Sequence, residues 1–247
     1  MKFLIQKIDK EVTHDFSFTL LESLRFLNWV RRGSDDLAKI KFFNTDSNSN
    51  LSDIEFKSYH INYIPVGSVE FVIKYFEQFY NVTPKPINVP EELFHPHYSR
   101  RPIFNGVEKD LAKGDGRWFV KSNSKIKSTC GILNINEPYE LPQGEYQFSE
   151  PISIDGEWRG FVRNKQLVGL QNYSGEFTKF PNVEAIKGMI NAYKSAPIAY
   201  TLDVGVNDFG TFVIECHDFF SCGLYGFNSP HLPHMFSQWF HEYVKKI

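Results

Sequence analysis

The chain has 247 residues, of which 42% are hydrophobic, 23% charged and 16% aromatic. This composition is typical of a soluble globular protein, and the length is sufficient for one large domain or two small ones. The formal net charge of −2 does not indicate a nucleic-acid or membrane-binding surface, and it leaves a local basic groove open.

The N-terminal stretch "MKFLIQKIDKEVTHD" has no apolar core segment and no small-residue cleavage site, so it predicts no secretion signal. No apolar run reaches the length of about 18 residues that a membrane span needs. The three cysteines lack zinc-ligand spacing, which favours a reducing compartment. We therefore expect a cytoplasmic protein without a membrane partner.

Strand and helix patterns fill the first part of the chain. Residues 2–8 and 59–66 are apolar runs that predict strands, and residues 16–30 carry apolar side chains at helical spacing. Ser68 is a good helix N-cap, and the apolar spacing that follows it predicts a helix over 69–81.

A proline-rich segment comes next, with five of the 13 prolines between residues 83 and 102. Such a density of proline indicates an extended connector. We place a domain boundary near residue 95, which gives domains 1–95 and 96–247. The basic "SRRP" at 99–102 is interpreted as a solvated loop, and contact with an anionic substrate is the alternative.

Strand patterns dominate after the connector. Residues 157–173 predict a hairpin that turns at Asn164 and Lys165, and Asn182 is the expected cap of a helix over 182–194. The other predicted elements are strands over 117–121 and 145–154, a hairpin over 201–219 and a helix over 233–247. The sequence therefore predicts an α+β fold with an antiparallel sheet in its second half.

The hairpin over 201–219 carries two acids in apolar surroundings, Asp203 and Glu215. If its loop is Asp208-Phe209-Gly210, a bulged turn places Asp203 directly opposite Glu215. Like charges that face each other destabilise a sheet unless a cation lies between them, and Mg²⁺ binds carboxylates in this way. A register that differs by one residue is the alternative, and it leaves Glu215 solvated.

Two arginines, Arg159 and Arg163, lie four residues apart in a predicted strand. They share one face of that strand, with Cα atoms about 13 Å apart. Guanidinium groups bind phosphate or carboxylate through two hydrogen bonds, so the pair could hold anionic groups. Two solvated surface arginines are the alternative.

Lys121 ends an apolar strand and is followed by a run of small polar residues that contains Lys127. A lysine in this place can reach phosphate oxygens, and the loop can cover them with backbone N–H groups. The Walker pattern is absent, so this run alone is a weak signal. Further along, Glu150 ends an extended segment where its carboxylate could accept hydrogen bonds from a ribose. An ordinary strand followed by a turn is the alternative.

Taken in order, these features resemble the ATP-grasp superfamily. The residues that carry the resemblance are "FVKSNSKIKSTCG", "FSEPI", "EWRGFVRNKQLVGLQNYSG" and "TLDVGV…TFVIECHDFFSCGLYGF", within residues 117–227. They look most like a divergent clade that holds a eukaryotic translation-initiation-factor assembly protein together with phage and bacterial relatives. The resemblance implies a two-lobed ATP-grasp fold with antiparallel sheets, preceded over 1–95 by a small α/β pre-ATP-grasp domain.

The resemblance also implies that ATP lies between the two lobes. Lys121 and Lys127 would contact the phosphates of ATP, and Glu150 would contact its ribose. Arg159 and Arg163 would orient a phosphate or an acceptor carboxylate.

Asp203 and Glu215 would hold Mg²⁺ in this arrangement. One residue departs from the family pattern, which usually has Asn two positions after the second acid, whereas this chain has His217. Imidazole suits softer metals than Mg²⁺. Either Asp218 takes over as a ligand, or the site accepts Mn²⁺.

Three functions are compatible with the resemblance. The first is an ADP-forming ligase that activates a carboxylate as an acyl phosphate for attack by an amine or similar nucleophile, with a protein or peptide as a candidate acceptor. The second is an ATP-binding assembly or regulatory factor with little turnover. The third is an adenylyl-transferring RNA ligase that acts through Lys121, although the net charge does not indicate a nucleic-acid partner.

Overall fold

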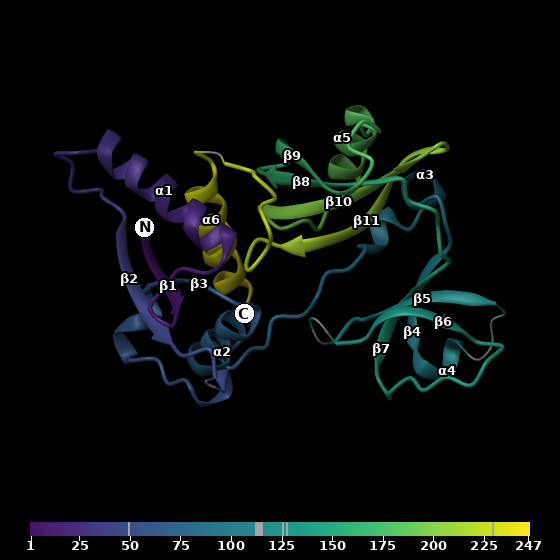
Figure 1. The fold of residues 1–247 in the computed structure, drawn as a ribbon, viewed down its shortest axis with the longest axis horizontal. Coiled ribbons are helices and arrows are strands. Elements are labelled where there is room, and N and C mark those ends of the chain that lie inside the picture. The colour runs from purple at the N-terminus through teal and green to yellow at the C-terminus, as the bar shows by residue number, and fades with distance from the viewer. Residues whose placement is uncertain (49, 112–115, 125, 127, 229) are drawn as a thin grey trace. The chain divides into compact units, whose positions relative to one another are not determined.

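The computed structural model describes residues 1–48, 50–111, 116–124, 126, 128–228 and 230–247 (Figure 1). Internal packing divides the chain into two units. The first unit consists of Met1–Pro84, Pro197–Tyr200 and Phe219–Ile247, and the second consists of Lys85–Ala196 and Thr201–Asp218. The first unit therefore contains segments that are distant in sequence.

A parallel three-stranded sheet lies at the centre of the first unit. β1 (Lys2–Ile8) pairs with β2 (Lys39–Thr45) on one side and with β3 (Ile64–Val66) on the other. α1 (Asp15–Val30) connects β1 to β2, and α2 (Val69–Tyr80) follows β3. Parallel strands need such crossover connections, so this unit has α/β character.

Two parts of this sheet differ from the sequence prediction. The predicted strand over 59–66 is wrong in its first half, where Ser58–Asn62 forms the short 3-10 helix η2. The hydroxyl of the buried Tyr75 holds this turn, since its oxygen lies 2.9 Å from the His60 carbonyl and 2.6 Å from the Tyr63 carbonyl. β2 was not predicted, because most of its side chains are exposed or half-buried and its apolar pattern is weak.

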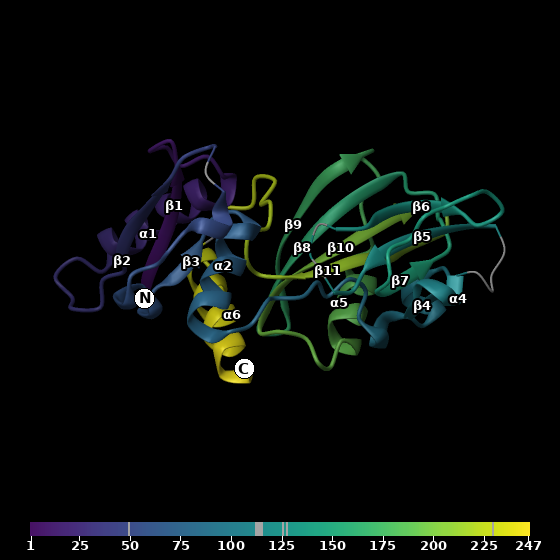
Figure 2. The same cartoon turned by 90° about the horizontal axis from the view of Figure 1, so that it is seen from below.

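Capping fixes both ends of α2. The Ser68 hydroxyl accepts a hydrogen bond from the Phe71 N–H at 3.2 Å, as predicted, and the helix ends at Asn81 with a φ of 54°. α6 (Leu232–Lys246) lies beside α2 (Figure 1 and Figure 2), where the rings of Phe76 and Trp239 are 5.8 Å apart between centroids. Aromatic packing of this kind completes the core of the first unit.

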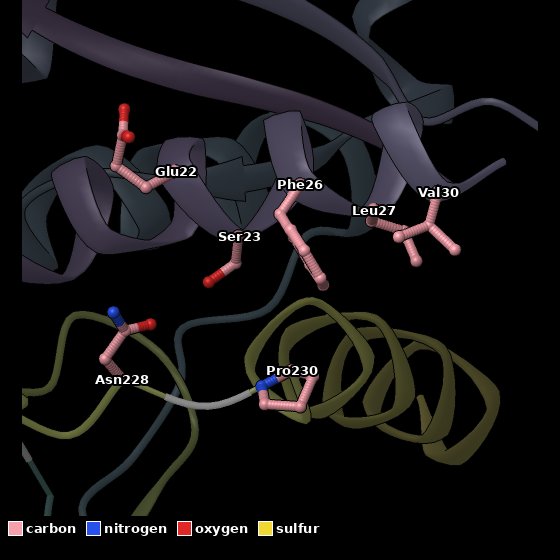
Figure 3. Close-up of a pocket in the computed structure, with 7 residues that line it drawn as sticks. All are labelled: Glu22, Ser23, Phe26, Leu27, Val30, Asn228 and Pro230. Carbon is pink, nitrogen blue, oxygen red and sulfur yellow. The ribbon is translucent and has the colours of Figure 1, made fainter. Parts of the chain in front are cut away.

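The surface of the first unit has an apolar groove of about 400 Å³. Phe26, Leu27 and Val30 of α1 form one wall, and Asn228 and Pro230 lie on the other side (Figure 3). Phe26 is 58% exposed and Val30 is 57% exposed. A groove with such walls favours a hydrophobic contact rather than chemistry.

The second unit contains two four-stranded sheets. In the first of them the strand order is β4-β7-β5-β6, and each neighbouring pair is antiparallel. Its core contains Leu111, Val120, Tyr146 and Phe148. The strands are β4 (Ile103–Val107), β5 (Arg117–Ser122), β6 (Cys130–Asn134) and β7 (Glu145–Ser149). β4 and β6 were not predicted, and β7 ends at Ser149 rather than at residue 154.

The other sheet has the strand order β11-β10-β8-β9. Its strands are β8 (Gly156–Arg163), β9 (Gln166–Gly175), β10 (Ala199–Asn207) and β11 (Gly210–Asp218). The turn between β8 and β9 at Asn164 and Lys165 is confirmed, with φ values of 51° and 60° that suit a two-residue hairpin. α5 (Val183–Ala192), capped by Asn182 as predicted, packs on this sheet (Figure 1).

The turn between β10 and β11 has the left-handed glycine that the predicted loop Asp208-Phe209-Gly210 requires. Asp208 and Phe209 alone connect the strands, and Gly210 is the first residue of β11. The Asn207 side chain accepts a hydrogen bond from the Phe209 N–H at 2.9 Å and so shapes the turn. Gly210 has a φ of 110°, which a residue with a side chain rarely adopts.

Short helices complete the structure: η1 (Leu51–Asp53), η3 (Glu91–Leu93), α3 (Pro96–Ser99) and α4 (Glu108–Leu111). The α+β class with antiparallel sheets is confirmed. The division into domains 1–95 and 96–247 stays a prediction, and by packing α6 belongs with the first unit. In the described ranges, no helix combines the length and the apolar character needed to cross a membrane.

Candidate functional site

The two sheets of the second unit meet at a cavity of about 230 Å³. Strands β5, β6, β7 and β11 contribute to its lining, together with the segment that follows β7 and the connector before β4. Most of the lining is apolar, from Val89, Phe119, Ile132, Pro151, Ile152, Ile154 and Ile214. A mainly apolar cavity with a few polar groups is the usual form of a ligand site.

One polar group of this cavity, the Gln147 amide, forms hydrogen bonds to the protein backbone. The Gln147 amide accepts a hydrogen bond from the Val89 N–H at 3.0 Å and donates to the Val89 carbonyl at 2.8 Å. Gln147 therefore holds the connector. The charged groups of the lining are Arg101, Lys121 and Glu150.

Lys121 of β5 forms an ion pair with Glu215 of β11, so the pair joins strands of different sheets. Their side chains are 20% and 16% exposed, respectively. Burial lowers the pKa of Lys121 from its ordinary value. The other carboxylate oxygen of Glu215, Oε1, lies 2.6 Å from Nε2 of His217.

Arg159 of β8 and Asp203 of β10 form a second ion pair, with two hydrogen bonds. The guanidinium donates from Nε to Oδ1 at 2.8 Å and from Nη2 to Oδ2 at 2.7 Å. Arg159 is 7% exposed and Asp203 is 1% exposed. This bidentate geometry is the strongest form of an arginine–carboxylate pair, and it accounts for an acid in the middle of a buried strand.

Asp203, Glu215 and His217 come together at one point, where one ligand atom of each lies within 4.8 Å of the others. Burial lowers the pKa of His217 to about 4, against the nearby carboxylate of Asp203. The imidazole is therefore neutral at pH 7, although 36% of this side chain is exposed. Two carboxylates and a neutral imidazole are a donor set that fits a divalent cation, with the imidazole better suited to Mn²⁺ than to Mg²⁺.

The remaining residues with a predicted role lie apart from this cluster or beside it. Glu150 directly follows β7 and is exposed at the cavity, with its backbone N–H bound to the Pro102 carbonyl at 3.2 Å. Arg163 is at the turn end of β8, opposite Gln166. Asp218 ends β11, and strand alternation turns it away from the face that carries His217. Lys127 lies outside the described residues.

Arg101 is a polar residue of the cavity that the sequence prediction missed. The solvated-loop interpretation of "SRRP" is wrong for this residue, because Arg101 is only 9% exposed. Its Nη1 donates to the carbonyls of Ser99 at 3.0 Å and Val213 at 2.9 Å. Burial lowers its pKa to about 10, so it stays a cation at pH 7. No local pattern could reveal this burial, since Val213 is far away in sequence.

A match to a protein-family model identifies the family of the chain that carries this site. A sequence model described as "ATP-grasp domain, R2K clade family 2" matches residues 98–234, more than half of the 247-residue chain. The chain belongs to this ATP-grasp family. The match confirms the resemblance drawn from the sequence, and it spans Lys121, Arg159 and the three residues of the cluster. A search of curated proteins gave no match.

Solved structures support the ATP-grasp fold. The RimK domain protein ATP-grasp from Sphaerobacter thermophilus is similar with a TM-score of 0.51 and 10% identity, over 99% of this chain and 100% of that one. N5-carboxyaminoimidazole synthetase from Staphylococcus aureus has a TM-score of 0.50 and 10% identity, over 88% of this chain and 71% of that one. At these identities the similarity concerns the fold alone.

A third similarity involves C-terminally truncated Cdc123 from Schizosaccharomyces pombe. It covers 40% of this chain and 42% of that one, at 16% identity and a TM-score of 0.28. This TM-score is too low to support an inference about the role of the present chain.

Proposed function

We propose that this ATP-grasp protein binds ATP with a divalent cation and uses it to activate a carboxylate. The observation that carries the proposal is the cluster of Asp203, Glu215 and His217 beside Lys121 and next to an apolar cavity. Such a site offers carboxylates to a cation, an ammonium group to phosphates and apolar walls to a base.

The base of ATP would occupy the apolar cavity between the sheets. The cavity of about 230 Å³ is smaller than pockets that enclose a whole small molecule, which typically measure about 300–1,000 Å³. It would therefore enclose the base and leave the phosphates to extend toward Lys121 and Arg101. Glu150, at the edge of the same cavity, would accept hydrogen bonds from the ribose.

Asp203 and Glu215 would hold the cation, with His217 as a third ligand. We propose Mg²⁺ as the usual cation and Mn²⁺ as an accepted one, because imidazole suits the softer ion. When bound, the cation would neutralise the charge that develops on the transferred phosphoryl group. Lys121 would exchange its contact with Glu215 for a phosphate oxygen.

In the proposed reaction a substrate carboxylate oxygen attacks the γ-phosphorus of ATP, and the bond to the β-phosphate oxygen breaks. The products are an acyl phosphate and ADP. An amine, for which we propose a protein or peptide, then attacks the acyl carbon, loses a proton and releases inorganic phosphate. Lys121 would stabilise the phosphates, and Arg159 and Arg163 would orient a phosphate or the carboxylate.

Calorimetric binding of AMP-PNP with Mg²⁺ tests the proposal directly. We expect saturable binding to the wild type and binding weakened by about tenfold or more in Glu215→Ala, since a phosphate-bound cation loses a carboxylate ligand. Glu184→Ala is the matched control, because Glu184 lies on α5 with its side chain 79% exposed. Absence of binding to folded wild type would overturn the proposal.

A second candidate function is an ATP-binding assembly or regulatory factor with little turnover. The contact between His217 and Glu215 favours it, because imidazole in the ligand set makes a less suitable Mg²⁺ site for phosphoryl transfer. Release of ADP from ATP, with and without a mixture of peptides, separates the two functions. Release that requires an acceptor supports the ligase, and tight binding without release supports the factor.

Adenylyl transfer through Lys121 is the third candidate. Its amine would have to leave Glu215 and attack the α-phosphorus as a free base, whereas the other two candidates need only an ammonium contact with a phosphate oxygen. ATP labelled at the α-phosphate tests it. Label that stays on Lys121 after denaturation would establish the adenylyl route.

A further inference from the structure

Asn88, in the connector before the first sheet of the second unit, joins the two strands that carry the proposed site. It is only 3% exposed and adopts a left-handed backbone with a φ of 55°. Asn tolerates this conformation better than most residues. A buried side-chain amide needs hydrogen-bond partners, and a left-handed backbone persists only where the surrounding contacts hold it.

The side chain of Asn88 binds the end of β5. Its Nδ2 donates to the Ser122 carbonyl at 2.9 Å and to Oδ1 of Asn123 at 2.7 Å. Ser122 directly follows Lys121, so this amide fixes the backbone next to the lysine that we propose for the phosphates. Asn123 in turn donates to Oδ1 of Asn105 at 3.1 Å on β4, which extends the network across the sheet.

The backbone of Asn88 binds β11 of the other sheet. Its carbonyl accepts a hydrogen bond from the Cys216 N–H at 2.7 Å, and the two residues form an isolated antiparallel bridge. Cys216 lies between Glu215 and His217, both of which belong to the proposed cation site. One residue thus contacts the strand of the phosphate-binding lysine and the strand of two cation ligands.

We propose that Asn88 is a positioning residue that couples cation binding to nucleotide binding. This inference rests on the proposed function, because it assigns the regulation of that same site. Lys121 and Glu215 come from different sheets, and a phosphate-bound cation requires both at a set separation. Asn88 supplies a direct hydrogen-bonded link between their strands, and its contacts set that separation.

The coupling is measurable as a ratio: the Kd of AMP-PNP in EDTA divided by its Kd in Mg²⁺ or Mn²⁺. We expect a ratio of about tenfold or more in the wild type, within the usual range of coupling between two ligands. In Asn88→Gly we expect the ratio to fall by about threefold or more, with the Kd in EDTA within about twofold of wild type. Glycine keeps the left-handed backbone and the carbonyl, and removes only the amide.

Asn81→Gly is the matched control. Asn81 has nearly the same backbone, with a φ of 54°, but it is the exposed C-cap of α2 in the first unit. We expect its ratio to equal that of the wild type. A merely structural role of Asn88 would weaken binding in both conditions in parallel and leave the ratio unchanged, which would overturn the inference.

A second variant keeps the test decisive if Asn88→Gly does not fold. Asn123→Ala removes one acceptor of the Asn88 amide at a half-buried position, and we expect the ratio to fall by about twofold. An unchanged ratio in this folded variant would also overturn the inference. If the wild type binds no AMP-PNP at all, the proposed function fails together with this inference; binding with unchanged ratios removes the inference alone.

Discussion

The two ion pairs of the second unit use similar chemistry in different settings. Arg159 and Asp203 join neighbouring strands of one sheet, and their side chains are 8% and 1% exposed. Lys121 and Glu215 join strands of different sheets, and their side chains are 20% and 16% exposed. The first pair is enclosed by its own sheet, whereas the second is open to a cavity.

This difference in burial predicts a difference in stability when one partner of each pair is removed. A buried charge that loses its partner keeps its full desolvation cost, because water cannot reach it. A partly exposed charge can bind water or a ligand instead. Both pairs contribute residues to the proposed site, so we expect a change in either to weaken binding, and a change in the first pair to cost more stability than a change in the second.

The largest effect is expected for Arg159→Met. It leaves the Asp203 carboxylate buried without a cation, so the free energy of unfolding in urea should fall by about 3–5 kcal/mol. The double variant Arg159→Met with Asp203→Leu removes both charges and should recover most of that loss. A double variant as unstable as the single one would show that the unpaired Asp203 carboxylate is not the cause of the loss.

Lys121→Met tests the open pair. Loss of a charged hydrogen bond to phosphate should weaken AMP-PNP binding by about 1.5–3 kcal/mol, measured by calorimetry with Mg²⁺. The urea midpoint should change less than in Arg159→Met, since water can solvate the Glu215 carboxylate left behind. Lys109→Met, at an exposed position on α4, is the control and should bind like the wild type. Equal binding by both variants would remove Lys121 from the site.

His217→Asn tests whether the imidazole that contacts Glu215 is a ligand of the cation. An amide oxygen replaces the imidazole, so the preference for Mn²⁺ over Mg²⁺ in the presence of AMP-PNP should fall by about fivefold. Electron paramagnetic resonance of free Mn²⁺ measures this preference by competition with Mg²⁺. His241→Asn, on the exposed face of α6, should leave it unchanged. An unaltered preference in His217→Asn would exclude the imidazole as a ligand.

The smallest loss of stability is expected for Lys187→Ala, which breaks an exposed ion pair. Lys187 pairs with Glu184 on α5 at 2.7 Å, but the side chains are 54% and 79% exposed. Exposed pairs of this type contribute only about 0.2–1 kcal/mol. The urea midpoint should therefore lie close to that of the wild type, and a loss as large as that of Arg159→Met would show that burial does not decide the effect.

The sequence was sufficient to predict the order of the chemical groups and most of the elements that carry them. Strand alternation and turn residues placed the hairpin at Asn164 and Lys165, and the resemblance to ATP-grasp proteins predicted that Asp203 and Glu215 would act together. These features depend on local patterns, which periodicity and turn chemistry report.

What could not be predicted depends on contacts between distant segments. The burial of Arg101 requires the Val213 carbonyl, and the role of Asn88 requires both Ser122 and Cys216. None of these contacts leaves a trace in the spacing of nearby residues. The pairing of Arg159 with Asp203 was also missed, because strand order in a sheet cannot be read from periodicity.

The composition of the first unit has a consequence for how the protein folds during synthesis. Its core combines Phe76 of α2 with Trp239 of α6, and the whole second unit lies between them in sequence. The sheets of the second unit can form as soon as residue 218 has left the ribosome. The apolar face of α2 has to wait for α6, so a chaperone that shields this face would act on the nascent chain during that interval.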